Sequence, residues 1–160
     1  MPDNLTGVVQ VSAGYGHTCA VTAGRNAVCW GYNNFGQAIV PAALGPASQI
    51  TAGFYHTCAL AANDNVACWG SNVLGQSEVP AGLTLVRQLS AGYGHTCALR
   101  TTGQVVCWGL NSQGQAAPPS GLPSVIQISA GYYHTCALTA DGALVCWGAN
   151  SYGQLDVPTG

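Results

Sequence analysis

A repeat of 39 residues runs through this chain and constrains its fold more than any other feature of the sequence. The repeated text is AGYGHTCAV, AGFYHTCAL, AGYGHTCAL and AGYYHTCAL, each followed by CWG, then GQ, then a proline. The register holds without an insertion through four periods, at residues 2–40, 41–79, 80–118 and 119–157. A fixed period of this length is typical of solenoids and propellers, in which each unit is too small to fold alone and must stack on its neighbours.

Within one repeat, the sequence predicts three or four short antiparallel strands. In the last repeat, VIQISAG is a β-branched run that ends at a glycine, and HTCAL and ALVCWG are two alternating runs joined by a turn. Gly103 and Gly142 suit the residue of positive φ that such a hairpin loop needs. No segment has the apolar spacing of a helix. The sequence therefore predicts an all-β chain of four antiparallel blades, as in a β-propeller.

The eight cysteines form four pairs, and each pair lies within one repeat. In the predicted hairpin, the two cysteines of a pair stand opposite each other on neighbouring strands, which suits a disulfide. Buried free thiols are an alternative, as is zinc bound by His17, Cys19 and Cys29, although three ligands without a close CxxC spacing match structural zinc sites poorly. Disulfides would imply a secreted or otherwise extracytoplasmic protein whose leader had been removed, because MPDNLT does not resemble one. The predicted pairs are Cys19/Cys29, Cys58/Cys68, Cys97/Cys107 and Cys136/Cys146.

The chain has too few charged residues for several classes of partner. Lysine and arginine together number three, the acids number five, and charged residues make up 5% of the chain. Because neutralising phosphates needs clustered basic residues, we expect no nucleic-acid partner and no binding to an anionic membrane surface. No apolar run is long enough for a membrane-spanning helix.

The stretch AGYYHTCALTADGALVCWGANSYGQL resembles the repeat of the regulator of chromosome condensation superfamily. Its linked elements AG, HTCAL (HTCAV in the first repeat), CWG, Asn and GQ recur in all four repeats. The short blade is similar to the bacterial branch that includes a secreted β-lactamase inhibitor protein. The resemblance implies a β-propeller, usually of seven blades. It implies little about function, because this superfold serves exchange factors, photoreceptors, inhibitors and scaffolds. Chromatin binding and nucleotide exchange are not transferred, since the repeats carry no basic arm and no inserted wedge.

Four blades are fewer than the resemblance requires, and this shortage predicts association. An open half-ring would expose the apolar sides of its terminal blades, and exposed patches of that size usually signal an interaction. We therefore expect a homodimer in which two chains form an eight-bladed ring with two-fold symmetry. A monomeric four-bladed ring and a fragment that needs missing blades are the alternatives.

Polar and aromatic residues that recur in every repeat are interpreted as scaffold. We expect each histidine of HTC to be buried and bonded to a neighbouring blade, and each tryptophan of CWG to lie in the core. We expect the recurring glutamines to satisfy backbone groups between strands or blades, and the asparagines to stabilise turns. These residues are His17, His56, His95 and His134; Trp30, Trp69, Trp108 and Trp147; Gln10, Gln49, Gln88 and Gln127; and Asn33, Asn72, Asn111 and Asn150.

No pattern of residues predicts an enzyme. Three repeats have a serine near the end of the first strand, but the second repeat has Thr51 there, and no Gly-x-Ser-x-Gly elbow is present. The acids are scattered, and only Glu78 and Asp156 share a repeat position, which does not suit glycoside hydrolysis by paired carboxylates. We expect no catalysis, no cofactor and no metal.

Aromatic residues beside the predicted turns are the candidate binding residues. The residue before each histidine alternates between glycine and tyrosine, next to a residue that is always aromatic. Rigid rings flanked by Asn, Ser and Gly suit protein recognition, whereas packing between blades would explain about half of them equally well. The candidates are Tyr15, Tyr32, Phe35, Phe54, Tyr55, Tyr93, Tyr132, Tyr133 and Tyr152.

Taken together, these features predict a non-enzymatic β-propeller scaffold or binding module for a protein partner. A lectin-like carbohydrate binder with one weak site per blade is the alternative from another class. A designed or excised propeller fragment without a biological function of its own is a third interpretation.

Overall fold

Each repeat folds into one three-stranded antiparallel sheet in the computed structural model, which describes residues 4–158. The strands of every sheet lie in sequence order, so the middle strand pairs with both others. The sheets are β1 (Val8–Ala13), β2 (His17–Thr22) and β3 (Ala27–Gly31); β4 (Ala47–Ala52), β5 (His56–Ala61) and β6 (Val66–Gly70); β7 (Val86–Ala91), β8 (His95–Arg100) and β9 (Val105–Gly109); and β10 (Val125–Ala130), β11 (His134–Thr139) and β12 (Leu144–Gly148). The prediction of an all-β chain with antiparallel blades is confirmed.

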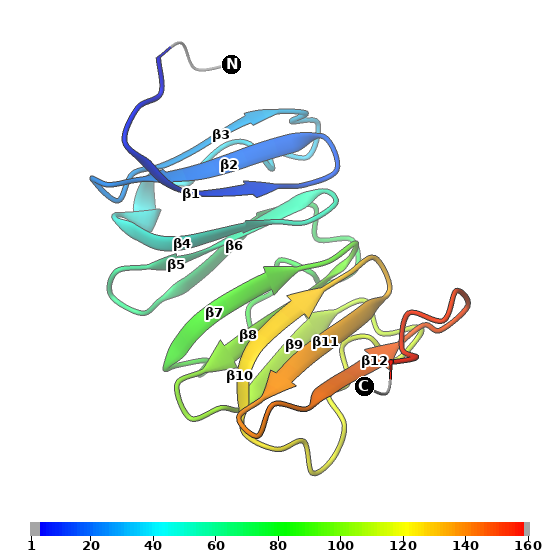
Figure 1. The fold of residues 1–160 in the computed structure, drawn as a ribbon. Coiled ribbons are helices and arrows are strands. Elements are labelled where there is room, and N and C mark those ends of the chain that lie inside the picture. Colours follow the sequence, from blue (N-terminus) through cyan, green and yellow to red (C-terminus); the bar gives the residue numbers. More distant parts are fainter. Residues whose placement is uncertain (1–3, 159–160) are drawn as a thin grey trace.

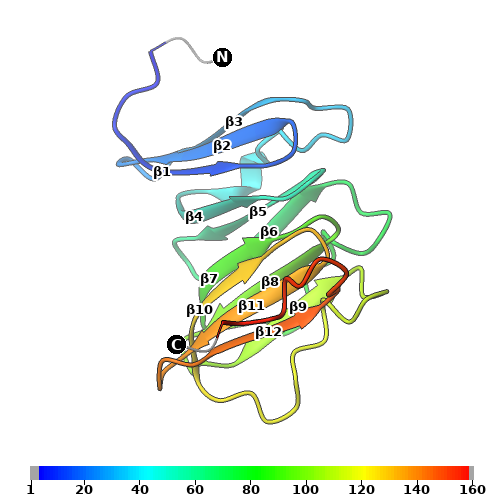
Figure 2. The same cartoon turned by 45° about the vertical axis from the view of Figure 1, so that its right-hand side comes forward.

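The four sheets follow one another in chain order, and we number them as blades 1 to 4. Figure 1 shows the blue first blade and the orange last blade at opposite ends of the row, and the turned view in Figure 2 shows the same order. The first strands β1, β4, β7 and β10 are neighbours from blade to blade. A short 3-10 helix, Ala42–Leu44, lies on the connection between blades 1 and 2. None of the residues that the structure describes forms a helix with the length and apolar character needed to cross a membrane.

A β-bulge interrupts the first strand of every blade at the same place. In blade 1, the pairing of β1 with β2 shifts between Val8 and Gln10, and the other three blades shift at the equivalent residues. A bulge leaves its extra residue unpaired and re-aims its neighbours. Val9 is accordingly 67% exposed, and the glutamine that follows it reaches the next blade.

The hairpin between the second and third strands closes on a residue of positive φ. Gly103 and Gly142 have φ of 85° and 87°, which confirms the prediction for blades 3 and 4. Arg25 and Asp64 hold the same position in blades 1 and 2, with φ of 61° and 66°. Arginine and aspartate are therefore tolerated in a conformation that glycine adopts without strain.

All four predicted disulfides are present. The register of the hairpin places Cys58 opposite Cys68, and the other pairs are equivalent. Sulfur atoms bonded to each other are not available to a metal, so zinc bound by His17, Cys19 and Cys29 does not describe this fold. The bonds join Cys19 to Cys29, Cys58 to Cys68, Cys97 to Cys107 and Cys136 to Cys146.

The hydrophobic core lies between blades. Between blades 2 and 3 it contains Leu60 from one blade and Val86, Leu89 and Trp108 from the other, and equivalent clusters join the remaining neighbours. Both faces of a blade are covered only when the blade has a neighbour on each side. The middle strand of blade 2 is consequently buried along its whole length, whereas buried and half-buried residues alternate along that of blade 4.

Candidate functional site

A hydrogen-bonded node joins each pair of adjacent blades beside the loops that carry the candidate binding residues. Between blades 2 and 3, His56 Nε2 lies 2.9 Å from Thr96 Oγ1, which donates to the Gln76 carbonyl oxygen at 3.0 Å. Trp108 Nε1 donates to the same carbonyl at 3.0 Å. Because the Thr96 hydroxyl proton is already used, His56 carries its proton on Nε2 and donates it. The equivalent groups are His17, Thr57, Gln37 and Trp69 between blades 1 and 2, and His95, Thr135, Gln115 and Trp147 between blades 3 and 4.

Burial keeps these histidines neutral. His56 and His95 are fully buried, and within the described residues their Nδ1 atoms have no hydrogen-bond partner. A proton on Nδ1 would place a charge in the interior without an acceptor. Loss of hydration, assisted by neighbouring histidines, therefore lowers the pKa of His56 to about 3 and that of His95 to about 4. Burial also lowers the pKa of His17. A neutral histidine held in one tautomer serves a structural role, as the sequence predicts.

The recurring glutamines and the first-strand hydroxyls also bond to the next blade. Gln10 Nε2 donates to the Ile50 carbonyl oxygen at 2.9 Å, and its Oε1 accepts from the Ile50 N–H at 2.8 Å. Ser12 Oγ accepts from the Ala52 N–H at 2.9 Å. Gln49, Thr51, Gln88 and Ser90 repeat these contacts. The serines considered as nucleophiles in blades 1 and 3 thus bind backbone groups of the neighbouring blade.

The recurring asparagines close the loop after the third strand. Asn33 Oδ1 accepts from the Ala38 N–H at 2.9 Å, and Asn72, Asn111 and Asn150 make the same bond five residues ahead. This confirms the predicted role in turns.

All seven tyrosines and both phenylalanines lie at one end of the blades, which we call the aromatic face. They occupy the loop between the first and second strands and the loop after the third strand. Because neighbouring strands are antiparallel, these two loops leave the sheet at the same end. The nine residues are those that the sequence singles out as binding candidates.

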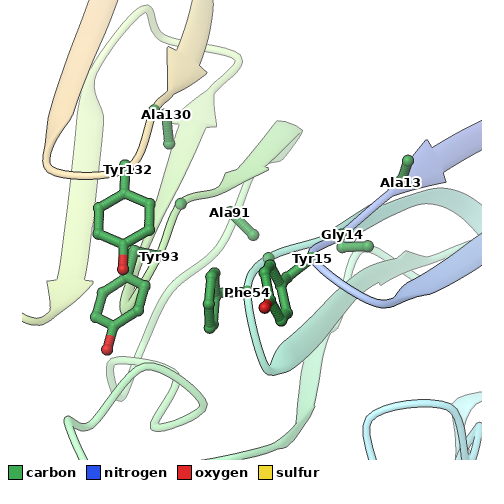
Figure 3. A pocket seen from close by; sticks show the side chains of 12 residues that line it. Ala13, Gly14, Tyr15, Phe54, Ala91, Tyr93, Ala130 and Tyr132 are labelled. Atoms are coloured by element: carbon green, nitrogen blue, oxygen red, sulfur yellow. The ribbon is translucent and has the colours of Figure 1, made fainter. Parts of the chain in front are cut away.

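Four rings, one from each blade, form a row across this face. Figure 3 shows Tyr15, Phe54, Tyr93 and Tyr132 side by side. Tyr15 stacks on Phe54 with ring centroids 4.0 Å apart, and Tyr93 stacks on Tyr132 at 4.3 Å. Phe54 meets Tyr93 edge to face at 4.8 Å, so the row is continuous. With the Ala-Gly pairs that precede them, these rings line an open hollow of about 370 Å³. We call them the aromatic row.

A second group of rings packs against the aromatic row. Tyr55 lies with its ring centroid 4.8 Å from that of Phe35 and 5.6 Å from that of Tyr32. Tyr133 lies edge to face on Tyr132 at 4.5 Å. Ring contacts thereby connect eight of the nine candidates. The remaining one, Tyr152, lines a second hollow, of about 410 Å³, together with Tyr132 and Tyr133.

Exposure separates rings that pack from rings that face solvent. Tyr15 is 67% exposed, Tyr132 50% and Tyr152 95%, whereas Phe54 and Tyr93 in the middle of the row are half-buried. Loss of hydration among neighbouring rings raises the pKa of Tyr132, so its phenol is a neutral hydrogen-bond donor near pH 7. The face offers apolar ring surface together with hydroxyl groups.

The loop glycines position the rings. A Cβ atom at Gly53 would lie 2.7 Å from the Gly92 carbonyl oxygen and would also overlap the His56 ring. Glycine therefore allows the loop of blade 2 to rest directly on the buried histidine and on the next loop. The close approach brings Phe54 within stacking distance of the aromatic residues of both neighbouring blades.

The threonine of HTC is the functional scaffold residue that the sequence interpretation missed. Thr57, Thr96 and Thr135 are fully buried, and each links a histidine of the preceding blade to a loop carbonyl. The signal was present, because threonine occupies this position in all four repeats.

The sequence matches the family of the regulator of chromosome condensation (RCC1) repeat at residues 8–37, 47–76, 86–115 and 125–154. Prp20p from Saccharomyces cerevisiae is similar in structure, with a TM-score of 0.80 and 25% identity over 94% of this chain and 46% of that one. The ectodomain of the Physcomitrella patens receptor kinase CR4 is similar with a TM-score of 0.74 and 28% identity, over 89% of this chain and 39% of that one. The CRINKLY WD40 ectodomain of the Arabidopsis thaliana receptor kinase ACR4 is similar with a TM-score of 0.74 and 26% identity, over 88% of this chain and 50% of that one. This chain spans half or less of these structures, and no curated protein sequence matches it significantly.

Proposed function

This chain belongs to the regulator of chromosome condensation repeat family, and from that membership we propose that it is a non-enzymatic protein-binding β-propeller module. The observation that carries the proposal is the concentration of every tyrosine and phenylalanine on the aromatic face. Aromatic rings give a large contact area for a small loss of side-chain entropy, and they dominate the binding energy of many protein interfaces. We infer that Tyr15 and Tyr132, the most exposed rings of the aromatic row, contact the partner first.

The similar proteins are consistent with protein binding as the class of function. Yeast RCC1 (Prp20) has been crystallised bound to Kap60, and Prp20p has been studied for binding to Gsp1p and histones. The two plant proteins are ectodomains of receptor kinases. We propose only the shared class for this chain, because its few charged residues do not suit a histone or nucleic-acid surface.

The four disulfides suggest an oxidising, extracytoplasmic environment. We propose that the protein is secreted and belongs with the short-blade bacterial branch that includes a secreted β-lactamase inhibitor protein. Under this proposal, the aromatic face acts as an inhibitor or adhesive surface.

A lectin-like function has less support, because the recurring side chains that it would use are engaged elsewhere. Trp69, Trp108 and Trp147 are at most 8% exposed, and their indole N–H groups bind backbone carbonyls. The recurring asparagines accept hydrogen bonds within their own loops. A sugar on the aromatic row would therefore meet buried tryptophans and asparagine carbonyl oxygens that are already hydrogen-bonded.

The proposal is tested by selecting partners from a displayed library of secreted proteins and from a glycan array with the same protein. The double variant Tyr15→Ala/Tyr132→Ala removes the exposed ends of the aromatic row. Thr102→Ala is the matched control, because Thr102 is exposed at a hairpin tip at the other end of blade 3. We expect protein ligands whose binding falls at least tenfold in the double variant and is unchanged in the control. Glycan binding that depends on the same two tyrosines would replace the proposal with the lectin, and protein ligands indifferent to them would refute the site.

A further inference from the structure

The first and last blades of the row each expose one of the two surfaces that form the interface between neighbouring blades. Each blade uses one side, the forward face, to contact the blade that follows it, and the opposite side, the backward face, to contact the blade that precedes it. The chain builds this interface three times, between blades 1 and 2, 2 and 3, and 3 and 4. We propose that the forward face of blade 4 binds the backward face of blade 1 in a second copy of this chain, so that two chains close an eight-bladed ring.

The backward face of blade 1 exposes the apolar residues that the other blades bury. Val8 is 43% exposed and Val11 63%. Their equivalents in blade 2, Ala47 and Ile50, are 0% and 1% exposed because the forward face of blade 1 covers them. The tryptophan follows the same pattern: Trp30 of blade 1 is half-buried, whereas those of blades 2 to 4 are buried.

The forward face of blade 4 shows the complementary exposure. Leu138 is half-buried, whereas its equivalents Val21, Leu60 and Leu99 are at most 5% exposed. Leu144, at the start of β12, is 47% exposed. These side chains occupy positions that face Val86 and Leu89 across the interface of blades 2 and 3. They are therefore placed to cover Val8 and Val11 of a second copy.

Polar groups at the two ends are also matched. Within residues 4–158, the side chains of Gln127, Ser129 and His134 make no hydrogen bond, although their equivalents in blades 1 to 3 all bond forward. The repeat assigns each of them a partner on blade 1. Gln127 faces the backbone of Val11, Ser129 faces the Ala13 N–H, and His134 faces Thr18. These partners are the repeat equivalents of Ile50, Ala52 and Thr57, which bond to Gln10, Ser12 and His17 between blades 1 and 2.

The loop after β12 fits the same junction. Between blades 2 and 3, the Leu74 side chain lies over Gly94, where it occupies the space that a Cβ atom of that glycine would take. Tyr152 is the repeat equivalent of Leu74, and Gly16 is that of Gly94. Tyr152 is 95% exposed. In the ring, its side chain lies over Gly16 of the second copy.

A second copy covers the backward face of blade 1 and the forward face of blade 4 at once. An unrelated partner would do so only if it carried the same two surfaces. Two identical junctions related by a two-fold axis close the assembly, and eight blades lie within the range of closed propellers. Tyr132 then neighbours Tyr15 of the other chain. The aromatic row of four rings becomes a ring of eight.

Two neighbouring valines provide a matched test. Val9 and Val11 have similar exposure. Val11 belongs to the proposed junction, whereas Val9 is the bulged residue, whose equivalents in blades 2 to 4 are all exposed. The wild-type chain and Val9→Arg are expected to sediment at twice the chain mass of 16.2 kDa, and Val11→Arg at the mass of one chain. A wild-type monomer at the highest soluble concentration would overturn the proposal, as would equal behaviour of the two variants. Growth beyond two chains would refute closure of the ring.

Mixing two blocked variants tests which face meets which. Val11→Arg blocks the backward face of blade 1, and Leu138→Arg blocks the forward face of blade 4. Each variant alone is expected to be monomeric, and an equimolar mixture is expected to form a dimer through the one unblocked pair of faces. Because only folded chains can associate in the mixture, a dimer there also excludes misfolding of Leu138→Arg. If Leu138→Arg is folded by circular dichroism and the mixture stays monomeric, the pairing of forward with backward face is wrong. None of these residues belongs to the aromatic row, so failure here leaves the test of protein binding unaffected.

Discussion

The substitution Thr96→Val tests the node that joins blades 2 and 3. Valine has nearly the shape of threonine, so the exchange removes the hydroxyl without opening a cavity. It deletes the acceptor of His56 Nε2–H at 2.9 Å and one of the two donors to the Gln76 carbonyl oxygen. The carbonyl keeps the Trp108 indole as its second donor at 3.0 Å. His56 is left without any partner, because its Nδ1 has none in the wild type within the described residues.

The expected loss of stability follows from these contacts. A buried polar group without a partner costs about 1 to 3 kcal/mol, and the lost bond to a carbonyl that keeps another donor costs about 0.5 kcal/mol more. We therefore expect Thr96→Val to lower the free energy of unfolding by about 1.5 to 3.5 kcal/mol. Thr96→Ser keeps both hydrogen bonds and loses one methyl group, which costs about 0.8 kcal/mol.

Urea unfolding followed by tryptophan fluorescence measures both changes. Thr18→Val is the matched control, because Thr18 holds the same position in blade 1 and its side chain makes no hydrogen bond among residues 4–158. At concentrations where the chain is monomeric, Thr18→Val should change stability by less than about 0.5 kcal/mol. The reasoning is refuted if Thr96→Val is no more destabilising than Thr96→Ser, or if Thr18→Val costs as much as Thr96→Val.

Acid should destabilise the fold between about pH 6.5 and pH 4, because His56 and His95 bind protons in the unfolded chain but not in the folded one. Each contributes a loss of up to about 1.4 kcal/mol per pH unit, and a urea midpoint that stays constant from pH 7 to about pH 4.5 would contradict this. Removing one disulfide by Cys58→Ala/Cys68→Ala should lower stability by about 2 to 3 kcal/mol, since the bond closes a loop with a sequence separation of 10. A urea midpoint equal to that of the wild type would contradict a native disulfide at this hairpin.

The parts of the fold that repeat were predictable, and the bulge shows where prediction stopped. Strand alternation around Cys136 and Cys146 placed both cysteines on one face and opposite each other, because the hairpin register depends on local turn chemistry. The bulge after Val8 was not predicted. With one extra residue in the first strand, the apolar pattern fits two pairing registers with the second strand. The bond of Gln10 to the next blade identifies the register that forms.

The candidate site was predictable as a set of residues but not as an arrangement. Comparing repeats singled out the nine aromatic residues, since loop positions such as that of Tyr55 vary where the scaffold does not. The stacking of Tyr15 on Phe54 depends on the spacing between two blades, which no property of one repeat determines. The role of Thr96 was missed for the same reason, because its partners lie in a blade and a loop that precede it.

The glutamine bonds between blades connect residues a constant 40 positions apart, as in Gln10 to Ile50, Gln49 to Leu89 and Gln88 to Ile128. Each repeat thus contains both the glutamine that bonds to the next blade and the backbone group that binds the glutamine of the preceding blade. Duplication or deletion of whole repeats in a gene would leave all remaining junctions intact, whereas a change by part of a repeat would remove one partner from a junction. Unequal recombination between repeats can therefore alter the number of blades in a single step while each remaining junction keeps both of its partners.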